Sequence, residues 1–226
     1  MFDGQFRAPV EKAVKPLGVA LRRTGLSPDH LTVIGLLVAV GAAFAIGAGK
    51  LQLGLLLVVL AALPDLLDGA LAKASGVASQ RGAFFDSVMD RVTDAVLFGG
   101  VAWYFASTES EHMALLPFAV MAVSSLISYE RAKAESLGLS AKGGLMERAE
   151  RIILLCIGLL FDGILVPVMW IMLVLTVMTA VQRFIKVWAQ AALAPAMEVK
   201  RDARRSRRAS RRAAFSARAA RSRPRQ

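Results

Sequence analysis

Cysteine is nearly absent from this sequence, because Cys156 is the only thiol in 226 residues and it lies within an apolar run. A single cysteine cannot form an internal disulfide, which excludes a small secreted domain held together by disulfide bonds. In apolar surroundings this thiol is expected to be ordinary packing. We therefore exclude redox chemistry as the function.

Acidic residues are scarce at the end of the chain. Residues 200–226 hold 12 of the 28 lysines and arginines but only one of the 17 acidic residues, so the net charge of +11 comes from this tail and the rest of the chain is neutral. A segment rich in arginine, serine and alanine has little to bury, so residues 196–226 are predicted to be a disordered cytoplasmic tail. Its expected partner is an anionic lipid surface, and no nucleic acid is expected.

Long polar stretches are missing upstream of the tail, and 56% of the whole chain is hydrophobic. Six apolar stretches approach the roughly 20 residues that a helix needs to cross a hydrocarbon core. Because lipid cannot satisfy backbone polar groups, each stretch must be helical. The sequence therefore predicts an all-α, polytopic membrane protein whose six transmembrane helices lie at residues 31–49, 51–73, 82–106, 113–132, 148–166 and 167–191.

The first 25 residues have a different pattern, with apolar residues at roughly helical spacing and basic residues between them. This pattern predicts an interfacial amphipathic helix at residues 1–25, ahead of a membrane domain at residues 26–195. The alternative, a cleaved signal peptide, requires an unbroken apolar centre that the segment lacks. Basic loops all fall on one side of the six predicted spans, which places both termini and that face of the domain in the cytoplasm, in a multi-pass protein of the cell membrane.

Five aspartates interrupt the second and third predicted spans. Asp65 and Asp68 are spaced i, i+3, and Asp86 and Asp90 are spaced i, i+4, so each pair projects from one face of its helix. Asp94 follows one turn later. A charge near the bilayer centre costs about 2.5 to 3.5 kcal/mol, so such residues require a partner, a cavity or an ion. The two pairs lie near the cytoplasmic ends of antiparallel spans and can face each other at one depth.

Four converging carboxylates repel one another unless cations neutralise them. All-oxygen ligands with no nearby histidine or cysteine suit Mg²⁺, Mn²⁺ or Ca²⁺ better than zinc, so we expect a site for one or two such ions. Gly69 and Gly82 flank the connecting loop, where a missing side chain lets a bulky ligand approach the backbone. In the alternative interpretation the acids pair only with Arg91, Lys73 or Arg81, but five acids exceed the nearby basic partners.

The spacing of these residues resembles the signature of the CDP-alcohol phosphotransferase family. The matching run is Asp65-x-x-Asp68-Gly69-x-x-Ala72-Lys73, then eight residues, then Gly82-x-x-x-Asp86-x-x-x-Asp90. The resemblance implies a six-span membrane enzyme, often a homodimer, that transfers a phosphatidyl group from CDP-diacylglycerol to an alcohol and releases CMP. It also implies that Asp65, Asp68, Asp86 and Asp90 hold two Mg²⁺ or Mn²⁺ ions and that Asp90 is the catalytic base. Sequence spacing alone leaves Asp86 and Asp94 open as bases.

The same resemblance implies contacts to the CDP-lipid. Its candidates are Asp29, Thr32, Gly69, Lys73, Ser79 and Gly82. Lys73 stands where the family usually has arginine, which keeps the charge but gives up a planar, bidentate grip on phosphate. In the alternative interpretation Ser27 or Asp29 only caps the first span, and both roles can hold together.

Basic residues in the fourth loop and the last span resemble those of the phosphatidylinositol phosphate synthases of actinobacteria. Several cations around one pocket suit an acceptor that already carries a phosphate, such as inositol 1-phosphate. The candidates for binding that phosphate are Ser128, Lys133, Arg148, Arg151 and Arg183. Lys133 replaces the usual arginine, and the cations could instead be only the positive-inside signal.

Three other functions remain open at this stage. A phosphatidylglycerophosphate synthase would use glycerol 3-phosphate as the acceptor. A divalent-cation transporter would place acids near the midplane and show inverted repeats, whereas these acids lie towards one face and no repeat is evident. An inactive scaffold of the same fold would be favoured by the loss of an aspartate, and all four are present.

Overall fold

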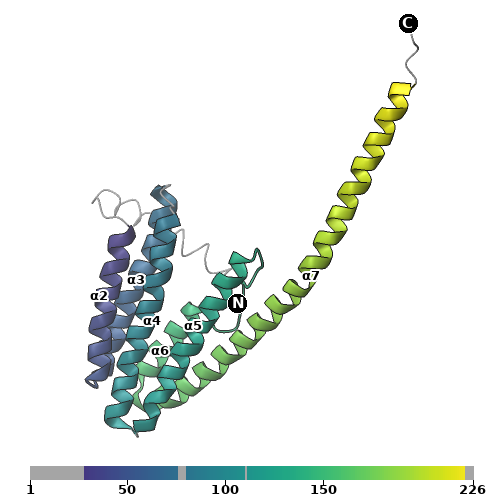
Figure 1. The fold of residues 1–226 in the computed structure, drawn as a ribbon. Helices are drawn as coiled ribbons and strands as arrows, with labels where there is room; N and C mark the ends of the chain where they lie inside the picture. Colours follow the sequence, from purple (N-terminus) through teal and green to yellow (C-terminus); the bar gives the residue numbers. More distant parts are fainter. Residues whose placement is uncertain (1–27, 76–79, 110, 222–226) are drawn as a thin grey trace.

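The computed structural model describes the backbone of residues 28–75, 80–109 and 111–221, and the side chains of these residues except those at 28, 64–75, 111, 162 and 194–221. Within these ranges the chain is helical and contains no strand, which confirms the all-α prediction. The interfacial helix predicted at residues 1–25 lies outside the described residues. The helices are α2 (Pro28–Gly47), α3 (Leu51–Ser75), α4 (Gln80–Thr108), α5 (Leu115–Ser136), α6 (Arg148–Leu160) and α7 (Leu165–Arg221) (Figure 1).

These six helices lie where the six spans are predicted, and the protein is a membrane protein. Three segments are long and apolar enough to cross a membrane, namely Asp29–Gly47, His112–Ser136 and Leu165–Leu193, and Leu51–Leu63 is a shorter apolar helix. Large apolar side chains such as Leu37, Phe44 and Ile185 point outward, where lipid rather than water can cover them. The full count of six spans stays a prediction.

The boundary between the fifth and sixth predicted spans differs in the structure. The apolar run suggests a span that reaches residue 166, but α6 ends at Leu160 and a short 3₁₀ turn, Asp162–Ile164, follows. Helix α7 then begins at Leu165, ahead of Pro167. A proline in the first turn of a helix removes no hydrogen bond, because that N–H has no partner in the helix. The turn at Asp162 and Gly163, rather than the proline, therefore separates the two helices.

Helix α2 packs against both α3 and α4, and small residues let it approach α4 closely. A Cβ atom added to Gly100 on α4 would lie 2.6 Å from the Cα atom of Ala43 on α2. Such close contact between small residues is a usual way for helices to pack in membranes, where the hydrophobic effect does not drive association. The buried core continues through Phe98 on α4 and Val120 on α5 to Leu155 and Met169, so all six helices share one core.

Helix α7 is much longer than the predicted sixth span. Its backbone continues past the bundle to Arg221, through the segment expected to be a disordered tail (Figure 1). Alanine and arginine are strong helix formers, so this composition can continue a helix that already exists. The helix that precedes residues 196–221 supplies the nucleus that an isolated tail would lack. The disordered tail stays a prediction.

Candidate functional site

Three aspartates form one acidic face of α4. Asp86, Asp90 and Asp94 are four residues apart, which places them on the same side of the helix. Asp94 is buried, with 8% of its surface exposed, and Asp86 and Asp90 are partly buried. Asp65 and Asp68 belong to helical backbone in α3, but their side chains lie outside the described residues. That the two acid pairs face each other therefore stays a prediction.

Helix α6 supplies two arginines to the acidic face of α4. Arg148 places Nη1 2.7 Å from Asp90 Oδ1 and Nε 3.5 Å from Asp94 Oδ1. Arg151 donates from Nη2 to Asp94 Oδ2 at 2.8 Å. Arg91 Nη1 also lies 3.4 Å from Asp90 Oδ2. Arg91 is one of the basic residues that the alternative interpretation expected to pair with the acids. The structure thus brings three predicted site residues together and adds Asp94, whose spacing left it open as an alternative base.

Arg183 is buried at the junction of α5, α6 and α7, with 4% of its surface exposed. Its Nε donates to the Gly143 carbonyl at 3.1 Å and its Nη1 to the Ile127 carbonyl at 3.2 Å. Its Nη2 donates to Glu147 Oε1 at 3.0 Å. A guanidinium has five N–H groups, so these bonds leave two for another acceptor. Arg183 therefore joins three elements of the structure.

The loop before α6 is fixed against α7. The Met146 N–H donates to Thr179 Oγ1 at 2.9 Å, and Gln190 Nε2 donates to the Ser140 carbonyl at 2.7 Å. A Cβ atom on Gly144 would lie 2.5 Å from Thr179 Cγ2, so this position has no room for a side chain. These contacts determine where α6 begins, and with it the position of its two arginines.

The other two predicted acceptor residues lie on α5. Ser128 is half-buried and donates to the Ser124 carbonyl of its own helix at 3.1 Å. Lys133 is exposed near the end of α5. Among the described residues, neither has an ion pair or a side-chain hydrogen bond to Arg148, Arg151 or Arg183.

The described residues among those predicted to contact a CDP-lipid lie at one end of the bundle. Asp29 and Thr32 are in the first turns of α2, half-buried and buried respectively. Gly82 is half-buried in the first turn of α4. Ser79 lies outside the described residues, as do the side-chain surroundings of Gly69 and Lys73 on α3.

Gly69 and Gly82 lie on either side of the connection between α3 and α4, as the sequence analysis expected. Helix α3 continues to Ser75 and α4 begins at Gln80, so both glycines are in helical backbone. The residues around Gly69 include alanine, leucine and lysine, which are strong helix formers. Their preference offsets the cost of one glycine, so the helix continues through it.

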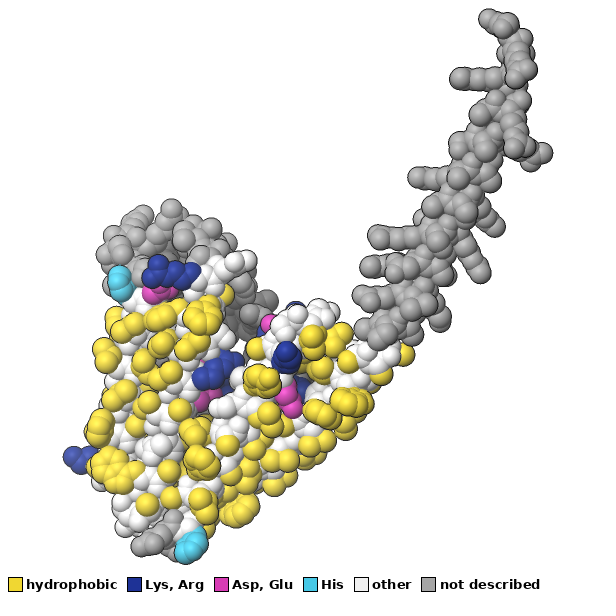
Figure 2. All heavy atoms as spheres, in the orientation of Figure 1, with side chains coloured by type: hydrophobic (Ala, Val, Ile, Leu, Met, Phe, Trp, Pro, Cys, Tyr) yellow, Lys and Arg dark blue, Asp and Glu magenta, His cyan; other side chains and the backbone are white. Residues whose placement is uncertain are grey.

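An apolar pocket of about 440 Å³ lies between α3, α4 and α6. Its walls include Ala62 of α3 and Thr93 of α4, and Arg148 supplies the charged group of its lining. Ala62 precedes Asp65 by three residues and Thr93 follows Asp90 by three, which is about 4.5 Å along each helix. The pocket therefore borders the backbone positions of both acid pairs. In Figure 2 apolar side chains cover most of this face of the helices, and charged ones gather in its middle, between α4 and α5.

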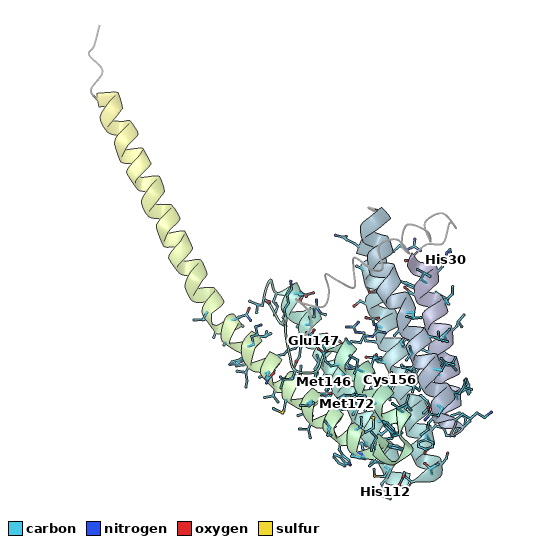
Figure 3. The ribbon with its side chains drawn as sticks, turned by 180° about the vertical axis from the view of Figure 1, so that it is seen from behind. His30, His112, Met146, Glu147, Cys156 and Met172 are labelled. Carbon is cyan, nitrogen blue, oxygen red and sulfur yellow. The ribbon has the colours of Figure 1, made fainter. Side chains whose placement is uncertain are left out.

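Within the described ranges, no group of three or more histidine, cysteine, aspartate or glutamate side chains is close enough to hold a metal ion. His30 and His112 lie at opposite ends of the bundle, so they cannot act together (Figure 3). Asp86 and Asp90 offer oxygen ligands alone, which is the donor chemistry that Mg²⁺ and Mn²⁺ prefer. The two predicted ligands on α4 thus have the donor atoms that such an ion prefers. The other two predicted ligands, Asp65 and Asp68, would have to come from α3.

Comparison with known proteins gives one consistent result. The chain matches the family of CDP-alcohol phosphatidyltransferases over residues 26–194. The phosphatidylinositol phosphate synthase of Mycobacteroides abscessus is 38% identical over 185 residues, which cover 78% of this chain and 84% of that relative. The crystal structure of the Mycobacterium tuberculosis phosphatidylinositol phosphate synthase with CDP-DAG bound is similar at a TM-score of 0.73 and 33% identity, covering 78% of this chain and 94% of that chain. The complex of that synthase with manganese and citrate has a TM-score of 0.71 at 33% identity, covering 77% and 88%.

Proposed function

Since the chain belongs to the CDP-alcohol phosphatidyltransferase family, we propose that it transfers a phosphatidyl group from CDP-diacylglycerol to inositol 1-phosphate and releases CMP. The observation that carries this proposal is the convergence of Arg148 and Arg151 on Asp90 and Asp94 beside an apolar pocket. An apolar cavity with a strongly charged end suits a reaction between a lipid and an anionic, water-soluble acceptor. The relatives named phosphatidylinositol phosphate synthase support the choice of acceptor.

The donor would lie with its apolar part in the pocket between α3, α4 and α6 and its nucleotide towards the ends of α2 and α4. That orientation places the pyrophosphate beside the acid pairs, because the pocket borders both of them. Asp29, Thr32, Gly69, Lys73, Ser79 and Gly82 are the proposed contacts to the CDP-lipid. Lysine at position 73 would neutralise a phosphate as a point charge rather than as a bidentate fork.

Asp65, Asp68, Asp86 and Asp90 are the proposed ligands for divalent ions, either Mg²⁺ or Mn²⁺ and two in number. When bound, such ions neutralise the charge on the pyrophosphate and stabilise the attacking and leaving oxygens of an in-line displacement. Asp90 would also accept the proton of the attacking hydroxyl, for which a carboxylate must lie within hydrogen-bond reach. The manganese complex of a relative at 33% identity supports a divalent ion here.

Arg148, Arg151 and Arg183 would bind the phosphate of the acceptor, with Ser128 and Lys133 completing that site from α5. Two features of the arginines favour this role. Arg151 keeps a buried Nε atom that has no acceptor among the described residues, and Arg183 keeps two of its N–H groups. A phosphate oxygen would satisfy such donors, which are otherwise unfavourable to bury.

The membrane setting of this reaction is also part of the proposal. The protein would be a homodimer in the cell membrane, with both termini and the site in the cytoplasm. The 12 basic residues at positions 200–226 would then lie beside the anionic inner leaflet, where each contributes about 1 kcal/mol of attraction when it is close to the surface.

A side-by-side acceptor assay tests the function. Purified protein with CDP-diacylglycerol and Mg²⁺ or Mn²⁺ is given inositol 1-phosphate, inositol, serine or glycerol 3-phosphate, and CMP release and the lipid product are measured. We expect inositol 1-phosphate to give phosphatidylinositol phosphate, and the uncharged inositol to react poorly because the arginines then have no phosphate to bind. Turnover with glycerol 3-phosphate alone would overturn the acceptor, and an absence of CMP with all four would overturn the reaction.

A further inference from the structure

Glu147 is the last residue of the loop between α5 and α6, and it lies where this loop, α6 and α7 meet. It is the N-cap residue of α6, with extended backbone at φ −90° and ψ −174°. Its N–H donates to Glu150 Oε2 at 3.2 Å, as in a capping box. Its own carboxylate accepts from Arg183 at 3.0 Å. Figure 3 shows Glu147 beside α7, at the end of the loop that precedes α6. One side chain thus joins the first turn of α6 to α7.

The start of α6 determines where its arginines point. Arg148 is the first residue of α6 and Arg151 lies one turn further, so both are on the same face. Their guanidinium groups reach Asp90 and Asp94 on α4. A rotation or a shift of this first turn would move both groups away from α4 together. Whatever fixes the N-cap residue therefore also fixes the two arginines.

Glu147 is equally important for Arg183. Among the described residues it makes the one ion pair of this buried guanidinium. Glu130 on α5 is close enough to attract Arg183 electrostatically, but its buried Oε2 atom has no hydrogen-bond partner there. Loss of the Glu147 carboxylate would leave a buried cation held only by two carbonyl groups, which is unfavourable.

We propose that Glu147 is a positioning residue that sets Arg148, Arg151 and Arg183 in a single arrangement for the phosphate of the acceptor. This inference rests on the proposed function, because it assigns the three arginines to the acceptor. Glu147 acts on the acceptor through these arginines and makes no contact of its own with the reacting atoms. Its loss therefore weakens acceptor binding and leaves donor binding unchanged.

The test separates the ion pair from the helix cap. Glu147→Ser keeps a strong N-cap residue but cannot reach Arg183, and Glu147→Gln keeps the length of the side chain without its charge. Glu147→Ser is expected to raise KM for inositol 1-phosphate about tenfold, which is the loss of one hydrogen bond to a charged group. Glu147→Gln should raise it less, because its amide oxygen can still accept a hydrogen bond from Arg183. In both variants KM for CDP-diacylglycerol should stay within about twofold of wild type. Glu147→Asp keeps both the cap and the charge and is expected to recover part of the loss. The matched control, Glu150→Ala, removes the capping partner and keeps the ion pair, so KM for the acceptor should rise much less than in Glu147→Ser.

The outcomes distinguish this inference from the function on which it rests. Wild-type KM in both Glu147→Ser and Glu147→Gln would overturn the positioning role while leaving the reaction intact. An equal rise in Glu150→Ala would also overturn it, because the cap alone would then explain the effect. If wild-type protein does not turn over inositol 1-phosphate at all, the proposed function fails first. Combining Glu147→Ser with Arg183→Gln should add little to the effect of Arg183→Gln alone, since the two side chains act as a pair.

Discussion

Asp90→Asn is expected to lower kcat by at least about 100-fold, the usual range for loss of a general base. The amide has nearly the same shape as the carboxylate, so α4 should fold, but it cannot take the proton of the attacking hydroxyl and is a weak ligand for Mg²⁺ or Mn²⁺. Arg148 would also lose its 2.7 Å ion pair and with it one of its contacts to α4. CMP release with CDP-diacylglycerol and inositol 1-phosphate measures the effect.

The control for Asp90→Asn is the same chemical change at an exposed site. Glu135 on α5 has 52% of its side chain exposed and pairs with Arg131 one turn earlier. Glu135→Gln should keep wild-type activity, because an exposed pair of this kind contributes little. Full activity in Asp90→Asn would remove Asp90 both as the base and as a necessary metal ligand.

Asp94→Ala is expected to destabilise the protein by about 3 to 5 kcal/mol, the usual result of leaving a buried charge without its partner. Asp94 and Arg151 are 8% and 4% exposed, and their ion pair of 2.8 Å joins α4 to α6. Thermal unfolding in detergent should therefore begin at a clearly lower temperature in this variant. Asp94→Asn should lose less, because its amide oxygen can still accept a hydrogen bond from the guanidinium.

A second substitution shows whether the unpaired charge is the cause. Asp94→Ala combined with Arg151→Met removes both charges, so the double variant should recover much of the stability that the single variant loses. Unchanged unfolding of Asp94→Ala would contradict the account of this pair, and so would a double variant whose losses simply add.

Much of the fold could be predicted from hydropathy, because lipid requires helices and the apolar runs locate them. Hydropathy failed at the end of α6 and was weak for α4. The apolar sequence from Leu159 to Val166 conceals the turn at Asp162 and Gly163, so the end of α6 was placed too late. Helix α4 does not qualify as a span by length and composition. The residues that interrupt its apolar sequence include Asp86, Asp90, Arg91 and Asp94, so the acidic face that gives α4 its proposed role also weakens its hydropathy.

The candidate site could be predicted only where its residues are close in the sequence. Helical spacing is enough to place Asp86 and Asp90 on one face, and it extends to Asp94, which was the signal for this third acid. Asp94 and Arg151 are 57 positions apart, and their pairing depends on how α6 docks against α4. The pairing of Glu147 with Arg183, 36 positions away, depends likewise on a loop held by α7. Spacing within one helix cannot give either contact.

Binding of Mn²⁺ to the purified protein, followed by electron paramagnetic resonance in detergent without substrate, tests the central claim most directly. The claim is that α3 and α4 share the ligands of the ions, so Asp68→Asn and Asp86→Asn should each weaken binding by at least about tenfold, the lower range for disturbing a metal site. Glu135→Gln should bind as the wild type does. Wild-type affinity in Asp68→Asn together with Asp86→Asn would show that the two helices do not hold a metal ion between them.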